Sequence, residues 1–295
     1  NGWILGYDNY YRPLVFKTVD GGITWNSVNS FTTNRLHDLF FISNSTGWIV
    51  GNGGSIIKTT DGGISWSNQN SSSGNSLNSV YFVNENIGWA VGNDGSILNT
   101  TNGGSNWFTQ TSGVTQHLKS VYFLDDNYGW AVGDEGTIIK TIDGGLNWTS
   151  HSIIAYYITS VYFINPNIGW IVTGRNIYKT TNGGITWLLE YTSSNYALYA
   201  INFMDNSNGW VIGNFGHIYK TANGGNDWLQ VSSGTRKIGN EIFFINENTG
   251  WVSFIDFGEY DHELLKTSDG GHSWIRLSNN WGISSIFFIN ESIGW

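Results

Sequence analysis

The sequence predicts an all-β fold, a seven-bladed β-propeller built from four-stranded antiparallel blades. One repeated phrase, "IIKTTDGGISW" at residues 56–66, has six further copies, and their final tryptophans lie about 41 residues apart. A second phrase, Gly-Trp, occurs eight times between these copies, so that 15 of the 16 tryptophans belong to two columns. A period of roughly 20–50 residues is typical of solenoids and propellers. The whole chain, residues 1–295, is therefore expected to form a single domain of seven repeats.

The composition supports a large β-rich core. Aromatic residues make up 16% of the 295 residues and charged residues only 12%, with 39 glycines available for turns. The net charge of −9 and the lack of any Lys/Arg run make nucleic acid or an anionic membrane surface a poor partner. No apolar run is long enough to span a bilayer. The chain has no cysteine, which excludes disulfides and thiolate metal sites.

Each repeat resolves into four runs of strand length. The third copy contains "LNSVYFV" (77–83), "GWAVG" (88–92), "SILNT" (96–100) and "NWFTQ" (106–110), which we name strands A, B, C and D. Tight turns such as "GNGG", "GNDG" and "GNFG" join B to C, as in antiparallel hairpins. One such small sheet cannot cover its own faces, whereas a ring of them can.

The two ends of the chain predict how the ring closes. The chain opens with strands B, C and D and ends with a seventh strand A, so we expect residues 284–290 to pair beside residues 1–6. The final "SIGW" at 292–295 begins an eighth strand B that would compete for the same place. We therefore expect either that this end frays or that the sequence is part of a longer chain whose repeats continue.

The phrase T-x-[DN]-G-G-x-[TSN]-W resembles the Asp box of BNR-repeat propellers. The fuller blade, "SVYF" then "GWAVG" then "KTTDGG" and tryptophan, resembles the photosystem II stability/assembly-factor-like family over the whole chain. The resemblance implies that strand A is innermost. It also implies that the B-to-C and D-to-A connections share one face, here named the top face, opposite the Asp-box turns. Such families include hydrolases, assembly factors and proteins of unknown role.

The Asp box itself is interpreted as structural. The Asp or Asn side chain can accept backbone N–H groups in an Asx-type turn, which explains why the two residues interchange. The paired glycines permit positive φ, and the tryptophan can bury its ring against the sheet. Because three copies carry Asn in place of Asp, a metal-binding or catalytic box is disfavoured. The seven residues are Asp20, Asp61, Asn102, Asp143, Asn182, Asn223 and Asp269.

Departures from the repeat mark the candidate binding site. The B-to-C connection is lengthened at residues 4–17 and 252–266, two loops that closure makes neighbours. Aromatic, cationic and acidic residues gather in this arc: Tyr10, Tyr11, Arg12, Arg35, Arg236, Asp256, Glu259, Tyr260, Asp261, Glu263 and Trp281. Such a mixture suits a peptide segment or a glycan. The alternative is that long loops simply collect solvated charge.

A second candidate is a ring at the top of the central channel, formed by the start of each strand A. Its expected members are all polar or amphipathic: His37, Asn78, Lys119, Thr159, Tyr199, Asn240 and Ser284. The alternative interpretation is a water-filled channel mouth. No histidine has metal-ligand spacing, so no metal site and no cofactor are predicted.

The sequence favours a non-enzymatic protein-interaction or assembly scaffold. A sialidase needs an arginine triad with a Tyr/Glu nucleophilic pair, and no recognisable set is present; nor is Ser-His-Asp spacing. The Asn-, Ser-, Thr- and Gly-rich surface suggests a secreted or cell-surface protein, with the periplasm as the alternative. The alternative function is a carbohydrate-binding or glycoside-hydrolase-type surface propeller. The expected partner is a protein or glycan on the top face.

Overall fold

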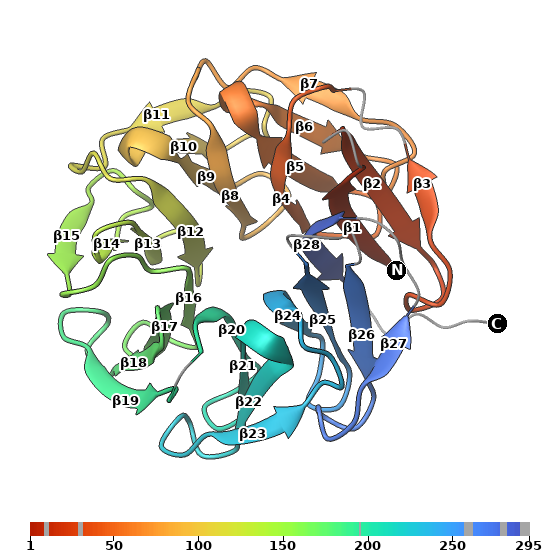
Figure 1. The fold of residues 1–295 in the computed structure, drawn as a ribbon. Helices are drawn as coiled ribbons and strands as arrows, with labels where there is room; N and C mark the ends of the chain where they lie inside the picture. The colour runs from red at the N-terminus through yellow and green to blue at the C-terminus, as the bar shows by residue number, and fades with distance from the viewer. Residues whose placement is uncertain (9–11, 29–31, 195, 257–261, 278–281, 290–295) are drawn as a thin grey trace.

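The computed structural model describes residues 1–8, 12–28, 32–194, 196–256, 262–277 and 282–289. Seven four-stranded antiparallel sheets are arranged in a ring around a central axis (Figure 1). The predicted fold class is confirmed. We number the blades 1 to 7, starting with the blade that contains the N-terminal strand.

The strands follow the A-B-C-D order from the axis outward in every blade. The A strands of blades 1 to 7 are β28 (Gly282–Phe288), β4 (Leu36–Phe41), β8 (Leu77–Phe82), β12 (Leu118–Phe123), β16 (Ser160–Phe163), β20 (Leu198–Phe203) and β24 (Ile238–Phe244). The B strands are β1 (Gly2–Tyr7), β5 (Gly47–Gly51), β9 (Gly88–Gly92), β13 (Gly129–Gly133), β17 (Gly169–Thr173), β21 (Gly209–Gly213) and β25 (Gly250–Ile255).

The outer strands are shorter or more exposed. The C strands are β2 (Pro13–Thr18), β6 (Ile56–Thr59), β10 (Ile97–Thr100), β14 (Thr137–Thr141), β18 (Asn176–Thr180), β22 (His217–Thr221) and β26 (Glu263–Thr267). The D strands are β3 (Asn26–Val28), β7 (Ser67–Gln69), β11 (Phe108–Gln110), β15 (Thr149–Ser152), β19 (Leu188–Thr192), β23 (Leu229–Ser232) and β27 (Ile275–Leu277). Three B-to-C connections form single 3-10 turns, η1 (Asn52–Gly54), η2 (Asn93–Gly95) and η3 (Asn214–Gly216).

The N- and C-terminal strands close the ring within blade 1. Strand β28 pairs antiparallel with β1, with Gly2 opposite Phe288 and Tyr7 opposite Gly282. The indole Nε1 of Trp251 in blade 7 donates a 3.2 Å hydrogen bond to the carbonyl of Gly21 in blade 1. The predicted closure is confirmed, while residues 292–295, expected to begin an eighth strand B, lie outside the described residues.

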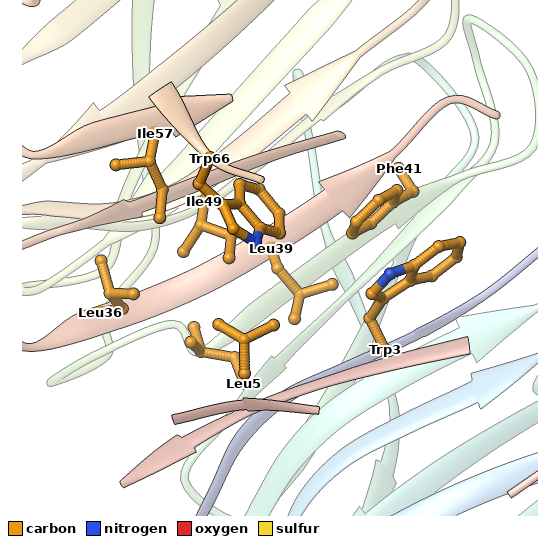
Figure 2. Packing of buried hydrophobic residues seen from close by; sticks show 9 residues of the cluster. Trp3, Leu5, Leu36, Leu39, Phe41, Ile49, Ile57 and Trp66 are labelled. Atoms are coloured by element: carbon orange, nitrogen blue, oxygen red, sulfur yellow. The ribbon is translucent and has the colours of Figure 1, made fainter. Parts of the chain in front are cut away.

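The core lies between blades, where the indole of each Gly-Trp tryptophan packs against the next blade. The ring of Trp3 stacks on Phe41 with centroids 3.6 Å apart (Figure 2). The Nε1 of Trp3 also donates a 3.1 Å hydrogen bond to the Gly62 carbonyl. The same stack recurs at all seven blade junctions. Six of the seven indoles also bond an Asp-box glycine of the next blade; in blade 5, Lys179 Nζ reaches the Gly224 carbonyl instead, at 2.8 Å.

The Asp boxes have the predicted turn geometry. Asp61 Oδ1 accepts a hydrogen bond from the Ser65 backbone N–H at 2.9 Å, and the Thr59 hydroxyl accepts one from Gly63 N–H at 2.8 Å. The equivalent Asp or Asn accepts a backbone N–H in all seven copies. Both glycines of every box have positive φ. The side-chain hydrogen bonds of the box therefore stabilise its own turn. A glycine carbonyl of the same turn accepts the hydrogen bond from the indole of the preceding blade.

The lower part of the central channel is lined by an aromatic layer from the A strands. The rings of Tyr81 and Tyr122 have centroids 5.1 Å apart, and those of Tyr122 and Tyr162 are 4.9 Å apart. Burial raises the pKa of Tyr81 to about 12. This aromatic layer lies below the polar residues at the upper mouth of the channel.

Candidate functional site

The top face is built by B-to-C turns lying against D-to-A connections. The Asn52 backbone N–H donates to the Arg35 carbonyl at 2.8 Å, and that of Asn214 donates to the Ala197 carbonyl at 2.9 Å. The Asp-box turns lie instead against the A-to-B turns, as in the 2.7 Å bond from Gly62 N–H to the Ser45 carbonyl. The predicted separation of the two faces is therefore present.

The predicted ring at the channel mouth forms one polar cavity. All seven expected residues, from His37 to Ser284, line a cavity of about 280 Å³. Several of them are held by the B-to-C turn of their own blade: His37 Nε2 lies 2.6 Å from Asn52 Oδ1, and Asn78 Nδ2 donates to Asn93 Oδ1 at 3.1 Å. Burial lowers the pKa of His37, so this histidine is neutral near pH 7.

Two carboxyl groups just below this ring were not predicted. Ser285 Oγ donates to Asp38 Oδ1 at 3.0 Å, and the Ile286 backbone N–H donates to Glu241 Oε2 at 2.6 Å. These contacts join blades 7, 1 and 2 at the closure. Burial, followed by the charge of Asp38, raises the pKa of Glu241 to about 8; burial also raises the pKa of Asp38. Aligning the repeats would have found the pair.

In an alignment of the seven repeats, the other five repeats have a small residue at the position of Asp38 and Glu241. These five residues are Ser79, Ser120, Ser160, Ala200 and Ser285. An acidic residue at this position is therefore a departure from the repeat, and it lies within strand A. The predicted departures lie in loops, so this pair within strand A was not among them.

The closure arc is partly described. Arg35 lies over the Tyr7 ring, with its guanidinium carbon 5.2 Å from the centroid, and His262 meets the same ring edge-on at 6.1 Å. Arg12 pairs with Asp8 at 2.6 Å, so its charge is neutralised locally. The structure thus brings residues of blades 7, 1 and 2 around Tyr7. The role of this arc in binding remains a prediction.

Several expected members of this arc lie outside the described residues: Tyr10, Tyr11, Glu259, Tyr260, Asp261 and Trp281. Asp256 directly follows β25, at the start of the lengthened loop. Glu263 was expected among the acids of that loop, but it lies at the start of β26 and is only 4% exposed. It pairs with Lys237 at 3.0 Å and with Arg276, which explains how a carboxylate is tolerated there.

Arg236 lines a hollow over blade 6. Tyr196, Phe215, His217 and Gln230 line this hollow of about 840 Å³ together with Arg236. The Tyr196 and His217 rings are stacked with centroids 4.1 Å apart, and Phe215 meets Tyr196 at 5.3 Å. The sequence predicts the "GNFG" around Phe215 only as a tight turn, so the part of this residue in the hollow was not predicted.

A further group of exposed side chains lies in the D-to-A connection after blade 4. Tyr156 is 92% exposed, and Ile154 and Tyr157 are also exposed. The Tyr156 carbonyl accepts a hydrogen bond from the Glu135 backbone N–H at 2.6 Å, which holds this connection against the B-to-C turn of the same blade. This connection and the hollow over blade 6 are two separate places on the top face, with blade 5 between them.

Within the described ranges, no group of three or more His, Asp and Glu side chains is placed to hold a metal ion. No helix in the same ranges has the length and apolar character required to cross a bilayer.

The ring of seven blades, each with an Asp-box turn, defines an Asp-box β-propeller whose top-face loops differ from blade to blade. The chain belongs to the photosynthesis system II assembly factor YCF48 family, whose sequence profile matches residues 17–112, 107–187 and 154–244. The predicted resemblance is confirmed. No curated protein sequence matches the chain.

Solved structures share the fold at low sequence identity. YCF48 bound to D1 peptide is 21% identical with a TM-score of 0.71, over 92% of this chain and 86% of that one. YCF48 from Cyanidioschyzon merolae is 21% identical with a TM-score of 0.69, over 85% and 87% of the two chains. The GH74 enzyme from Niastella koreensis is 16% identical with a TM-score of 0.69, over 88% of this chain but only 47% of its own.

Proposed function

We propose that this chain is a non-enzymatic scaffold that binds a protein partner on its top face during assembly of a larger complex. The observation that carries the proposal is that large aromatic residues are exposed at two places there, at Tyr156 and Tyr157 and at Phe215. Large exposed apolar groups in contact with one another mark interaction surfaces, whereas apolar residues scattered singly are ordinary. Tyr156 and Tyr157 are adjacent in the sequence, and the ring of Tyr196 contacts that of Phe215.

The Asp-box face provides the contrast. Its exposed apolar residues are aliphatic rather than aromatic: Ile23, Ile64, Leu146 and Ile185 share one turn position, and Val19 and Ile142 add a second in blades 1 and 4. Family membership and the solved complex of YCF48 with D1 peptide further support a protein partner. We also propose that the protein works outside the cytoplasm, at the cell surface or in the periplasm; fractionation of the native host would test this location.

A matched pair of variants on opposite faces of blade 4 tests the role. The pure chain would be immobilised to capture partners from host extract, and the captured protein would then be purified and its affinity measured. Tyr156→Ser should weaken that affinity by about tenfold or more, because aromatic anchors dominate interfaces. Leu146→Ser, which removes an 83% exposed side chain from the Asp-box face, should not.

Two outcomes would overturn the proposal. The first is loss of affinity in Leu146→Ser with no change in Tyr156→Ser, which would move the partner to the Asp-box face. The second is a glycan array in which one sugar class binds the chain while no protein is captured. That result would favour a carbohydrate-binding propeller.

A further inference from the structure

Blade 6 differs from blades 2 and 3 at three positions that meet on the top face. In blade 2, Asn34 Nδ2 donates a 2.7 Å hydrogen bond to Ser55 Oγ; the same Asn–Ser bond spans 2.8 Å in blade 3. At the equivalent positions of blade 6, the rings of Tyr196 and His217 are stacked. A small polar contact has thus been replaced by two aromatic rings on an unchanged backbone.

The third position is unfavourable for folding. Phe215 occupies the left-handed region at φ 56°, where blade 2 has Gly53 at φ 62°. A bulky side chain is rarely found in this region, which glycine adopts freely. Phe215 is also 56% exposed, so its ring gains little from burial. A residue that is both strained and exposed points to a role in binding.

The charge around the hollow selects the ligand. Its lining contains Arg236 and no Asp or Glu, in a chain whose net charge is −9. Burial lowers the pKa of His217, so Arg236 is the cation of this hollow at neutral pH. Among the described residues no carboxylate pairs with Arg236, and nearby Glu263 already holds Lys237 and Arg276. The hollow therefore favours an anionic group.

The outer strand of blade 6 favours an extended chain over a sugar. Three consecutive residues of β23, Gln230, Val231 and Ser232, line the hollow. In the described part of the chain, β23 pairs only with β22, so its other backbone edge has no neighbouring strand. Such an edge can pair with the backbone of a peptide, while adjacent pockets receive its side chains.

We propose that this hollow anchors an extended peptide segment of the partner in which an acidic residue lies next to an aromatic or aliphatic one. The proposal rests on the proposed function and names its anchoring site. The apolar side chain packs into the corner formed by Phe215 and Tyr196. The carboxylate pairs with Arg236, and the peptide backbone runs along β23.

A selection from a random heptapeptide phage library on the immobilised chain tests the proposal. The comparison protein is the triple variant Tyr196→Asn, Phe215→Gly and His217→Ser, which gives blade 6 the residues of blade 2. Its melting temperature should equal or exceed that of the wild type, because glycine at position 215 relieves the strain of a left-handed backbone conformation at phenylalanine. Peptides with adjacent acidic and apolar residues should be enriched at least tenfold on the wild type relative to the triple variant.

Single variants separate the two parts of the site. Measured by fluorescence polarisation with an enriched peptide, Phe215→Gly should weaken binding about tenfold, by loss of an aromatic anchor. Arg236→Gln should weaken the binding of the acidic peptide. It should leave unchanged the binding of the analogue in which the peptide's carboxylate is replaced by an amide. Glu135→Gly, at the same turn position of blade 4, is the control and should retain wild-type affinity.

Enrichment that is equal on the wild type and the triple variant would overturn the proposal, as would enrichment of basic peptides. If the captured partner depends on Tyr156 but the triple variant binds it normally, this site is wrong while the proposed scaffold function stands. If no protein partner exists but the hollow still selects acidic peptides, the proposed function fails and the site stands.

Discussion

Blades 2 and 6 share one scaffold and differ in what they carry on it. Trp48 stacks on Phe82 with centroids 3.5 Å apart and planes inclined by 10°, and Trp210 stacks on Phe244 at 3.7 Å and 12°. Their indoles donate hydrogen bonds of 3.1 Å and 3.0 Å to the next Asp box. The contacts between blades are thus nearly identical.

The B-to-C turns of these two blades are also nearly superimposable. Gly53 has φ 62° and ψ 30°, and Phe215 has φ 56° and ψ 32°. The turn therefore keeps a conformation suited to glycine even when phenylalanine occupies it. The comparison teaches that packing between blades determines the backbone, while the top-face side chains are free to vary.

The largest expected effect tests whether the two scaffolds are equivalent. Trp48→Ala and Trp210→Ala should each lower the free energy of unfolding by about 3–5 kcal/mol, because each empties a fully buried ring site between blades. Chemical denaturation would measure both variants. A much smaller loss for Trp210→Ala would show that blade 6 contributes less to the scaffold than blade 2.

A second difference is the acid of strand A, Asp38 in blade 2, where blade 6 has Ala200. Because the pKa of its neighbour Glu241 is raised to about 8, the folded state holds a proton that the unfolded state releases at lower pH. This stabilisation is fully present below the ordinary glutamate pKa of 4.5 and is lost as pH rises through about 8.

The wild type should therefore melt at a lower temperature at high pH than at mildly acidic pH, while Glu241→Gln should reduce this difference. Glu247→Gln, an exposed acid in the same blade, is the control and should leave the pH dependence unchanged. An unchanged slope in Glu241→Gln would contradict a buried proton at the closure.

The smallest expected effect lies in the Asp boxes. Asp61→Ala in blade 2 should cost about 0.5–2 kcal/mol at neutral pH, by analogy with side-chain caps. Hydrogen bonds from Ser65 lower the pKa of Asp61 to about 2, so its stabilisation is present above its ordinary pKa and is lost as pH falls through about 2. Asn223 in blade 6 does not titrate.

Denaturation of Asp61→Ala and Asn223→Ala as a function of pH would distinguish the two boxes. The cost of Asp61→Ala should shrink in acid, whereas the cost of Asn223→Ala should not. Equal pH dependence in both would show that the box charge is irrelevant. Loss of partner binding at unchanged stability would instead assign the box a ligand role.

Much of the fold could be predicted because its signals are local and repeated. The Thr-x-Asp-Gly-Gly-x-x-Trp spacing specifies a turn whose hydrogen bonds lie within a few residues, as at Asp61. The count of A strands against B-C-D sets predicted seven blades and the pairing of β28 with β1. The channel-mouth ring could be predicted because each of its residues begins a strand A.

The contacts of the candidate sites could not be predicted in the same way. Trp3 bonds Gly62, 59 residues away, and Ser285 bonds Asp38, 247 residues away. The hollow of blade 6, which Arg236 lines together with Tyr196 and Phe215, could not be predicted. Neighbouring loops on the top face come from different blades, and their side-chain directions depend on packing that no single repeat contains.

By itself the sequence determined the strands, the Asp-box turns, the number of blades and the closure, because these follow from short-range spacing repeated seven times. Only the tertiary structure decided which repeat-breaking residues meet. It joined Asp38 to Glu241 through Ser285, and it placed Phe215 beside Tyr196. The physical reason is that such pairs form across blades or between separate connections of one blade, where the ring geometry, rather than the local chain, sets the distances.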